Sequence, residues 1–155
     1  MVTSRKCSIQ KRFPRLAVDG IITKNKEILL VKRNVYPFRG YWTLPGGHIE
    51  YGETVEQAIG REIKEELNLT IKIKQLIGIF SGPRRDPRYH LISISYWLQI
   101  ISGNIRLNQE ANQFAYFPLN KLPPKIGADH RQIIEQFKKQ YIKNKKLIKN
   151  QNVRH

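Results

Sequence analysis

Residues 47–69 read GHIEYGETVEQAIGREIKEELNL and contain the clearest helical pattern in the chain. Thr54 is followed three residues later by Gln57, a spacing typical of a capping box at a helix start. Apolar residues then recur every three or four positions and predict one buried stripe: Val55, Ala58, Ile59, Ile63 and Leu67. Asn68 stands where a left-handed C-terminal cap is expected, since asparagine tolerates that conformation better than most residues.

The same helix carries three glutamates at spacings of three and four. Glu62, Glu65 and Glu66 are predicted to project from one side, away from the apolar stripe. Their mutual repulsion is expected to destabilise the helix by a few tenths of a kcal/mol per pair, about the size seen for like charges at this spacing. A hard cation such as Mg²⁺ or Mn²⁺ would explain such a cluster of oxygen ligands. The alternative is a solvated acidic face, neutralised by Arg61 and Lys64.

The spacing of charged residues in this stretch resembles the Nudix box, G-x5-E-x7-R-E-U-x-E-E-x-G-U, in which U is aliphatic. Eight positions match over residues 47–69, and Asn68 replaces the last glycine, a mild change at a helix C-cap. The resemblance covers about residues 16–122. It implies an α/β protein, a Nudix-type α/β/α sandwich with a mixed β-sheet, and metal-dependent hydrolysis of a nucleoside diphosphate linked to another group.

The resemblance also assigns roles to individual residues. It implies that Mg²⁺, or alternatively Mn²⁺, is held by three carboxylates and one backbone carbonyl, those of Glu62, Glu65, Glu66 and Gly46. Arg61 is expected to pair with Glu53 and to orient the ligating carboxylates. Divalent ions neutralise a pyrophosphate and lower the pKa of bound water, and a carboxylate then takes the proton. Glu65 is either a third ligand or this base.

A second acidic position precedes the last expected strand. Related enzymes often read D-E-A-x-E-A-x-W-F there, whereas residues 109–117 read QEANQFAYF. Glu110 matches the first glutamate, but Gln113 replaces the second and cannot act as a base. The expected catalytic residues are therefore Arg61, Glu65, Glu66 and Glu110. For Glu110, an exposed residue at the start of a strand is the alternative.

Residues 81–90, SGPRRDPRYH, resemble the S-D-P-x-R-D-P-R-x-H loop of ADP-ribose pyrophosphatases within this superfamily. Asp129 and His130 ahead of an apolar helix resemble the end of those enzymes. The resemblance implies hydrolysis of ADP-ribose to AMP and ribose 5-phosphate. The substrate-binding residues are expected to be Arg33, Arg85, Asp86, Arg88 and His90, although the loop could instead be a basic surface turn.

Other substrates and one non-enzymatic function stay open at this point. Modified nucleoside triphosphates and RNA 5′ ends are alternative substrates, and a nucleotide- or RNA-binding module is the non-catalytic alternative. The intact Glu62, Glu65 and Glu66 argue against that module. The substrate is expected to be a small nucleotide, and a homodimer is expected by analogy with related enzymes.

Positive charge is concentrated at the chain ends. The 28 Lys and Arg against 12 Asp and Glu give a net charge of +16. Residues 1–16 and 137–155 hold twelve of the basic groups and no acid. Such ends attract polyanions, so nucleic-acid binding is conceivable, but solvated ends are favoured. We predict a basic tail at 1–12, a Nudix domain at 13–142 and a second basic tail at 143–155.

The composition excludes several classes of protein. Apolar runs do not exceed four residues, so no membrane-spanning helix is expected. Cys7 is the single cysteine, which excludes an intramolecular disulfide and a zinc cluster of thiolates and favours a reducing cytoplasm.

Strands are predicted at 16–23, 27–33, 42–44, 70–80, 91–101 and 112–117, with a turn at 45–47. The closing helix is expected from Ile126 or Asp129 to about Ile142.

Overall fold

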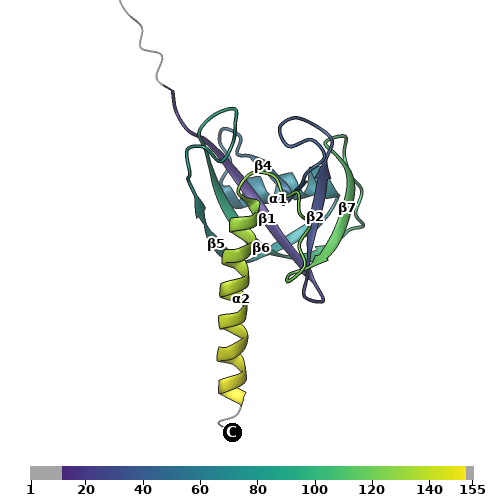
Figure 1. Ribbon diagram of the computed structural model, residues 1–155, viewed down its shortest axis with the longest axis vertical. Helices are drawn as coiled ribbons and strands as arrows, with labels where there is room; N and C mark the ends of the chain where they lie inside the picture. The colour runs from purple at the N-terminus through teal and green to yellow at the C-terminus, as the bar shows by residue number, and fades with distance from the viewer. Residues whose placement is uncertain (1–11, 153–155) are drawn as a thin grey trace, which may run out of the picture.

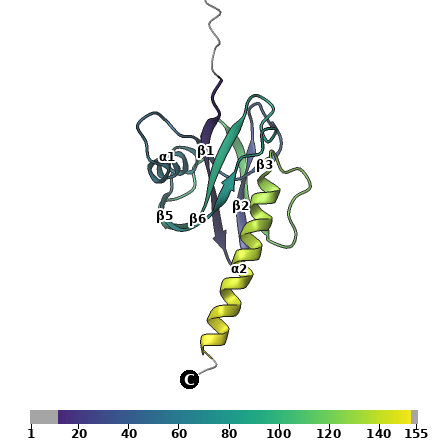
Figure 2. The ribbon, with the colours of Figure 1, turned by 90° about the vertical axis from the view of Figure 1, so that its left-hand side faces the viewer.

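The computed structural model describes residues 12–152, and these form one mixed β-sheet with a helix on each side. The elements are β1 (Arg15–Lys24), β2 (Glu27–Arg33), β3 (Trp42–Thr43), β4 (Gly46–His48), α1 (Val55–Leu67), β5 (Thr70–Phe80), β6 (Leu91–Ser102), β7 (Ala111–Pro118) and α2 (His130–Asn152). Figures 1 and 2 show the sheet between α1 and α2, which confirms the predicted α/β/α sandwich.

The strand order is β3-β2-β1-β6-β5, with β4 paired to β1 and β7 paired to β2. The pairing of β1 with β6 is parallel and the other pairings are antiparallel. Because β1 lies at the centre, both of its faces are covered, and its residues 17–22 are buried. This explains why its sequence is a nearly continuous apolar run.

The core consists of two clusters, one under each helix. Val18 and Ile22 of β1 pack with Ile59 and Ile63 of α1. On the opposite face, the α2 cluster contains Ile21, Ile28, Leu30, Leu44, Ile77, Ile133, Ile134 and Phe137. The apolar stripe of α1 is therefore buried as its spacing predicts, and the sheet positions both helices.

Local chemistry sets both ends of α1. The Thr54 side chain accepts a hydrogen bond from the Gln57 amide at 3.2 Å, and the Gln57 side chain accepts one from the Thr54 amide at 2.9 Å. At the other end Asn68 has φ 57° and ψ 30°, and its amide donates to the Lys64 carbonyl. The capping box and the left-handed cap are both confirmed.

The turn predicted at 45–47 is only partly present, because Gly46 already begins β4. Asp19, Val18 and Ala17 of β1 pair in register with Gly46, Gly47 and His48. Gly46 has φ 149°, and a side chain on it would collide with the Val18 carbonyl. Only glycine permits this close approach of two strands. In the sequence alone, the same glycines indicate a turn.

The closing helix is longer than predicted, since α2 continues to Asn152. Residues 128–155 contain no glycine or proline to end it, and lysine and glutamine are good helix formers. Asn144 still contacts the sheet, donating to the Gln75 side chain at 3.2 Å. Figure 1 shows the last turns of α2 extending beyond the sheet. Residues 1–11 of the predicted N-terminal tail lie outside the described residues.

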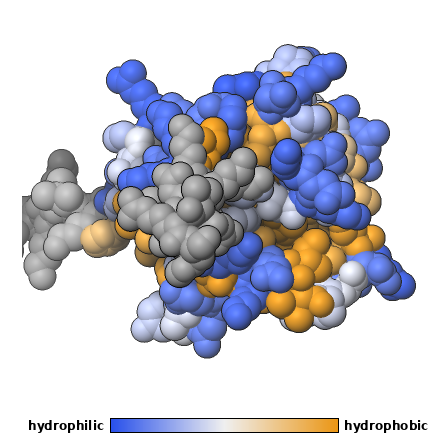
Figure 3. Space-filling model, turned by 90° about the horizontal axis from the view of Figure 1, so that it is seen from below, coloured by the Kyte–Doolittle hydropathy of each residue, from blue (hydrophilic) through white to orange (hydrophobic). Residues whose placement is uncertain are grey.

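The surface at the α2 end of the molecule is largely hydrophilic, with apolar groups gathered in smaller areas (Figure 3). Within residues 12–152, no helix is both long enough and apolar enough to cross a membrane.

Candidate active site

A cavity of about 460 Å³ opens beside the carboxylates of α1. It is large enough for a drug-sized ligand. Its lining includes Gly46, Gly47 and His48 of β4, Glu62 and Glu65 of α1, and Arg33, Arg88 and Glu110 from other elements. Carboxylates and arginines that are far apart in the sequence therefore share one cavity.

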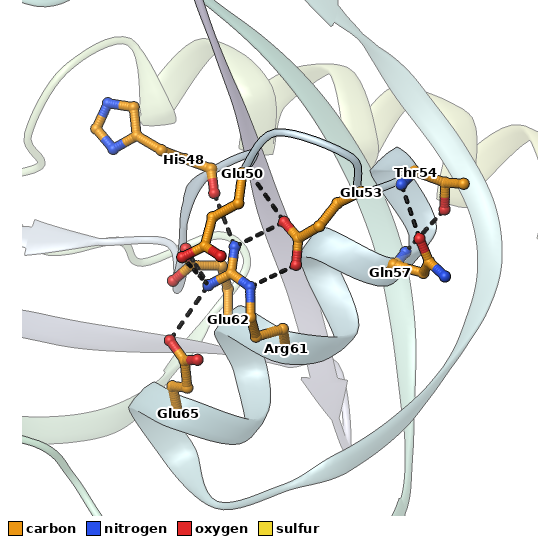
Figure 4. Close-up of polar contacts among 8 residues, drawn as sticks. All are labelled: His48, Glu50, Glu53, Thr54, Gln57, Arg61, Glu62 and Glu65. Carbon is orange, nitrogen blue, oxygen red and sulfur yellow. Dashed lines mark hydrogen bonds and ion pairs between the residues drawn. The ribbon is translucent and has the colours of Figure 1, made fainter.

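Arg61 forms the most connected ion-pair centre at this cavity (Figure 4). Its Nε and Nη2 donate to the two Glu53 oxygens at 2.6 and 2.9 Å, the pair that the motif implies. Its Nη1 donates to Glu62 at 3.0 Å and to Glu65 at 3.2 Å, and Nη2 also donates to the His48 carbonyl. The hydrogen bonds from Arg61 and from the Glu50 amide lower the pKa of Glu53 to about 2.

Glu66 occupies a different environment from its neighbours. Its side chain is buried, and its Oε2 accepts a hydrogen bond from the Gly46 amide at 3.0 Å. Burial raises the pKa of Glu66 to about 8, with a further upward contribution from the charges of Glu62 and Glu110. The expectation that all three glutamates project away from the apolar stripe is wrong for Glu66, because position 66 follows Ile63 on the buried side of α1.

Glu62 lies between the solvent and the sheet, directly against β4. Burial raises the pKa of this carboxyl group, and the hydrogen bond from Arg61 opposes that shift. A side chain on Gly47 would collide with the Glu62 carboxyl group. The glycine at the first position of the motif therefore leaves the space that this carboxylate occupies.

This set of donors fits a divalent cation in its chemistry. Glu62 and Glu66 have raised pKa values, so a bound cation would stabilise their charged forms. Among the described residues, no three acidic, histidine or cysteine side chains are already gathered as a metal site. The Arg61 guanidinium instead contacts Glu62 and Glu65 and lies 4.0 Å from Glu50. Those carboxylates would have to turn from Arg61 toward a cation.

The two predicted loop arginines have different surroundings. Arg85 is almost completely buried, with a forked contact to Asp129 at 2.6–3.0 Å and an ion pair to Asp19 at 3.5 Å. Arg88 is partly exposed and pairs with Asp86 at 2.9–3.0 Å. Both arginines line the cavity, but the Arg88 side chain is 31% exposed and that of Arg85 only 3%, although the Asp86 partner of Arg88 is itself buried.

Of the remaining predicted site residues, Arg33 and Glu110 line the cavity and His90 does not. Arg33 lines the cavity, and its Nε donates to the Pro37 carbonyl at 3.0 Å. Glu110 also lines the cavity, facing the helix glutamates closely enough to influence the pKa of Glu66. His90 does not line this cavity, and its Nε2 lies 3.2 Å from the Ser81 carbonyl. The structure therefore does not bring His90 to the other predicted residues.

A buried polar group at the cavity floor was absent from the sequence prediction. Asp19 accepts a hydrogen bond from Ser93 Oγ and lies 3.5 Å from both Arg85 Nη2 and His130 Nε2. The Nδ1 atom of His130 accepts a hydrogen bond from the Leu44 amide at 2.8 Å. Burial lowers the pKa of His130, which favours the neutral imidazole. A lone aspartate within the apolar β1 sequence was the available signal.

His48 is a second residue that the sequence prediction omitted. Its Nε2 lies 2.8 Å from the Tyr89 hydroxyl, and the guanidinium groups of Arg15 and Arg88 lie 4.4 and 4.8 Å from the Tyr89 ring centroid. Partial burial, followed by the charges of these two arginines, lowers the pKa of His48. Of these residues, His48 and Arg88 line the cavity.

The acidic residues of the chain are concentrated around this cavity. Six of the twelve line it directly: Asp19, Glu50, Glu62, Glu65, Asp86 and Glu110. Glu53, Glu66 and Asp129 are hydrogen-bonded to residues that line it. Nine of the twelve acidic groups therefore belong to one site, in a chain with a net charge of +16.

A model of the NUDIX domain matches residues 13–137. The chain therefore belongs to the Nudix family, and it is a Nudix pyrophosphohydrolase. It is 50% identical over 124 residues to the ADP-ribose pyrophosphatase of Methanocaldococcus jannaschii, covering 80% of this chain and 73% of that protein. The NAD-capped RNA hydrolase NudC of Edwardsiella ictaluri is 33% identical over 132 residues, with 81% of this chain aligned. The chain spans about half the length of NudC, 49%.

Solved structures agree with this assignment. The MutT Nudix hydrolase of Burkholderia pseudomallei has a TM-score of 0.75 and 30% identity, over 81% of this chain and 98% of that chain. The bifunctional NMN adenylyltransferase/ADP-ribose pyrophosphatase of Francisella tularensis, complexed with AMP and a Mn ion, has a TM-score of 0.72 and 27% identity. That match covers 84% of this chain and 43% of the other. The predicted family and fold are both confirmed.

Proposed function

We propose that this enzyme hydrolyses ADP-ribose to AMP and ribose 5-phosphate. The observation that carries the proposal is the division of one cavity into glutamates on α1 and the accessible cations Arg33 and Arg88. A pyrophosphate needs both, because cations neutralise its charge and carboxylates activate water. The 50% identity to an ADP-ribose pyrophosphatase supports this substrate over other nucleotides.

A second hollow of about 650 Å³ adjoins the cavity. Two neighbouring spaces favour the proposal that the substrate has two large halves. Phe38, Arg85 and Ala128 line both spaces, and Arg84 and Gln132 line only the second. A nucleoside diphosphate linked to a sugar has two such halves on either side of its pyrophosphate. Arg33 and Arg88 would bind the phosphates between them.

The proposed cation is Mg²⁺, with Mn²⁺ as the alternative. Glu62, Glu65, Glu66 and the Gly46 carbonyl would hold it. Arg61, which contacts Glu62 and Glu65 in the structure, would stay beside them as they turn toward the cation. When bound, the cation would polarise the phosphoryl oxygens and neutralise their charge. Glu65 or Glu110 would take a proton from water as its oxygen bonds to phosphorus, and the phosphorus–oxygen bond of the pyrophosphate bridge would break.

A substrate panel tests this proposal directly. ADP-ribose, NADH, nucleoside triphosphates and triphosphorylated RNA are incubated with the enzyme and Mg²⁺ or Mn²⁺, and products are separated by chromatography. We expect AMP from ADP-ribose at the highest kcat/KM, and no turnover in EDTA. The same panel is run with Glu66→Gln, which removes a proposed ligand of the cation. Glu56→Gln is its matched control, since Glu56 is also on α1 but contacts Tyr96. Faster turnover of another substrate would refute the proposal.

RNA 5′ ends are the second candidate substrate. The similarity to NudC and the acid-free basic stretches at both ends of the chain favour this alternative over modified triphosphates. A NAD-capped RNA added to the panel separates the two candidates.

The homodimer and the cytoplasmic location stay predictions. Light scattering tests the first, and fractionation of cells tests the second.

A further inference from the structure

The backbone from Leu44 to Gly46 carries three successive hydrogen bonds, each to a different element. The Leu44 amide donates to His130 Nδ1 at 2.8 Å, the Pro45 carbonyl accepts from the Gly20 amide at 2.8 Å, and the Gly46 amide donates to Glu66 at 3.0 Å. This short link between β3 and β4 therefore connects α2, β1 and the glutamates of α1.

His130 provides the only side chain that contacts the Leu44 amide among the hydrogen bonds of the described residues. An imidazole nitrogen can accept a hydrogen bond only when it carries no proton, so the proton of His130 must lie on Nε2. Nε2 faces Asp19 Oδ1 at 3.5 Å, and Asp19 is buried at the cavity floor. Asp19 therefore favours the tautomer in which Nδ1 can bind Leu44.

We propose that His130 is a positioning residue for the glutamate site. By holding the Leu44 amide, it fixes the backbone that directs the Gly46 amide at Glu66, and Asp19 fixes His130 in turn. This inference rests on the proposed function, in which Glu66 and Gly46 hold the divalent cation. Because His130 is the first residue of α2, the docking of this helix is thereby connected to the cation site.

Two conservative variants separate the contacts of the imidazole. In His130→Asn, the side-chain oxygen stands near the place of Nδ1 and can still accept from Leu44. In His130→Gln, the amide group reaches the place of Nε2 and can still contact Asp19. Both variants keep a neutral polar group at a buried position, so a role in packing alone predicts similar effects for the two.

The experiment measures Mn²⁺ affinity by electron paramagnetic resonance, together with kcat and KM for ADP-ribose. We expect His130→Gln to weaken Mn²⁺ binding and to lower kcat by about tenfold or more, in the range known for residues that support metal ligands. KM should change less than about threefold, and His130→Asn should stay within about threefold of the wild type for all three quantities. Hydrogen exchange should be faster at the Leu44 amide in His130→Gln only.

The control is Gln136→Leu, which removes another hydrogen bond between α2 and the sheet, from Gln136 Nε2 to the Ile77 carbonyl at 2.9 Å. This variant should leave Mn²⁺ affinity unchanged. Equal effects of the Asn and Gln variants, or an effect of neither, would overturn the role of His130. A wild-type enzyme that neither binds Mn²⁺ nor hydrolyses ADP-ribose would instead refute the proposed function.

Discussion

Arg61 contacts both oxygens of Glu53, with Nε 2.6 Å from Oε1 and Nη2 2.9 Å from Oε2. This forked arrangement leaves Nη1 free to donate to Glu62 and Glu65. The same guanidinium therefore forms a forked pair with Glu53 and also donates hydrogen bonds to two glutamates of the cavity. Lysine carries the same charge but lacks the planar fork that makes these contacts simultaneously.

We predict that Arg61→Lys lowers kcat by about tenfold or more, as expected when a group that orients metal ligands is lost. KM for ADP-ribose should change little, because the proposed role of Arg61 is to orient carboxylates and not to bind the substrate. Steady-state kinetics check this. Lys64→Gln is the control, since Lys64 is exposed on the same helix. An unchanged kcat in Arg61→Lys would show that the fork is dispensable.

Glu66→Gln should lower kcat by at least about a hundredfold, equivalent to roughly 2.7 kcal/mol of transition-state stabilisation. The substitution keeps the shape of the side chain but removes a charge that would hold the cation. Single-turnover measurements at saturating Mg²⁺ are the test. Turnover near that of the wild type would exclude Glu66 as a ligand.

The same substitution should change how stability depends on pH in EDTA. The folded-state pKa of Glu66, about 8, lies above its ordinary value of 4.5, so the folded state retains a proton that the unfolded state releases. The contribution of Glu66 to stability is therefore fully present below about pH 4.5 and is lost as the pH rises toward about 8. From about pH 4 to about pH 9, Glu66→Gln should gain several kcal/mol relative to the wild type in urea unfolding, with about 5 kcal/mol as the upper bound set by this shift.

Arg85→Ala should lower stability more than Arg88→Ala does, and Arg88→Ala is the variant expected to lower activity. Removal of Arg85 leaves the buried Asp19 and the partly buried Asp129 without their cation, so we expect the free energy of unfolding to fall by about 3 kcal/mol or more. Arg88 is partly exposed but its partner Asp86 is buried, so its removal should reduce stability by about 1–3 kcal/mol, less than the loss of Arg85. Urea denaturation measures both.

The activity of the two variants separates their roles further. Arg88→Ala should lower kcat/KM for ADP-ribose more than for a nucleoside triphosphate, since Arg88 faces the cavity. Equal losses on both substrates would show that the loop has only a structural role. Arg85→Lys, which retains a cation, should recover part of the stability that Arg85→Ala loses.

The helix cap provides a prediction that is independent of catalysis. Asn68→Gly should leave stability within about 0.5 kcal/mol of the wild type, because glycine adopts φ 57° without strain but loses the contact to the Asn104 carbonyl. Asn68→Ala should cost about 1 kcal/mol at the same position. Thermal unfolding tests the order of the variants, and an alanine variant as stable as the glycine variant would contradict it.

Removal of residues 145–155 should leave kcat/KM for ADP-ribose within about threefold, or under roughly 0.7 kcal/mol. A chain that ends at Asn144 keeps the contact to Gln75 and the packing of Phe137 against the sheet. Kinetics and circular dichroism on the shortened chain provide the test. A large loss of turnover in a folded protein would mean that the end of α2 acts on the site.

The elements set by neighbouring residues could be predicted from the sequence, and those set by distant contacts could not. The caps of α1 and its apolar stripe depend on spacings of three and four, which are visible in residues 54–68. β4 depends on the approach of Gly46 to Val18, and a Pro-Gly-Gly sequence does not reveal that approach. The end of α2 is not visible in the sequence, because a run of lysines is as typical of a solvated tail as of an exposed helix.

The contacts among the motif residues of the candidate site could be predicted from the sequence, whereas those that depend on burial could not. The sequence places Glu62 and Arg61 together because they are adjacent on one helix. It does not show that Arg85 is buried between Asp19 and Asp129, since arginine-rich loops are usually exposed. The contact between Asp19 and His130 joins β1 to α2 and is visible only after the sheet has assembled.

The gathering of nine acidic residues around one cavity leaves only Glu27, Glu56 and Glu135 to balance the basic groups elsewhere. At long range the molecule therefore presents a positive field, whereas six acidic side chains and four arginines line the cavity beside α1. Diffusing anions are drawn toward the protein by the outer charge, but they can settle among the glutamates only together with a cation. The rate of association thus depends on the outer charge, and the affinity of the bound substrate depends on the cavity. Added salt should therefore lower the association rate far more than the affinity.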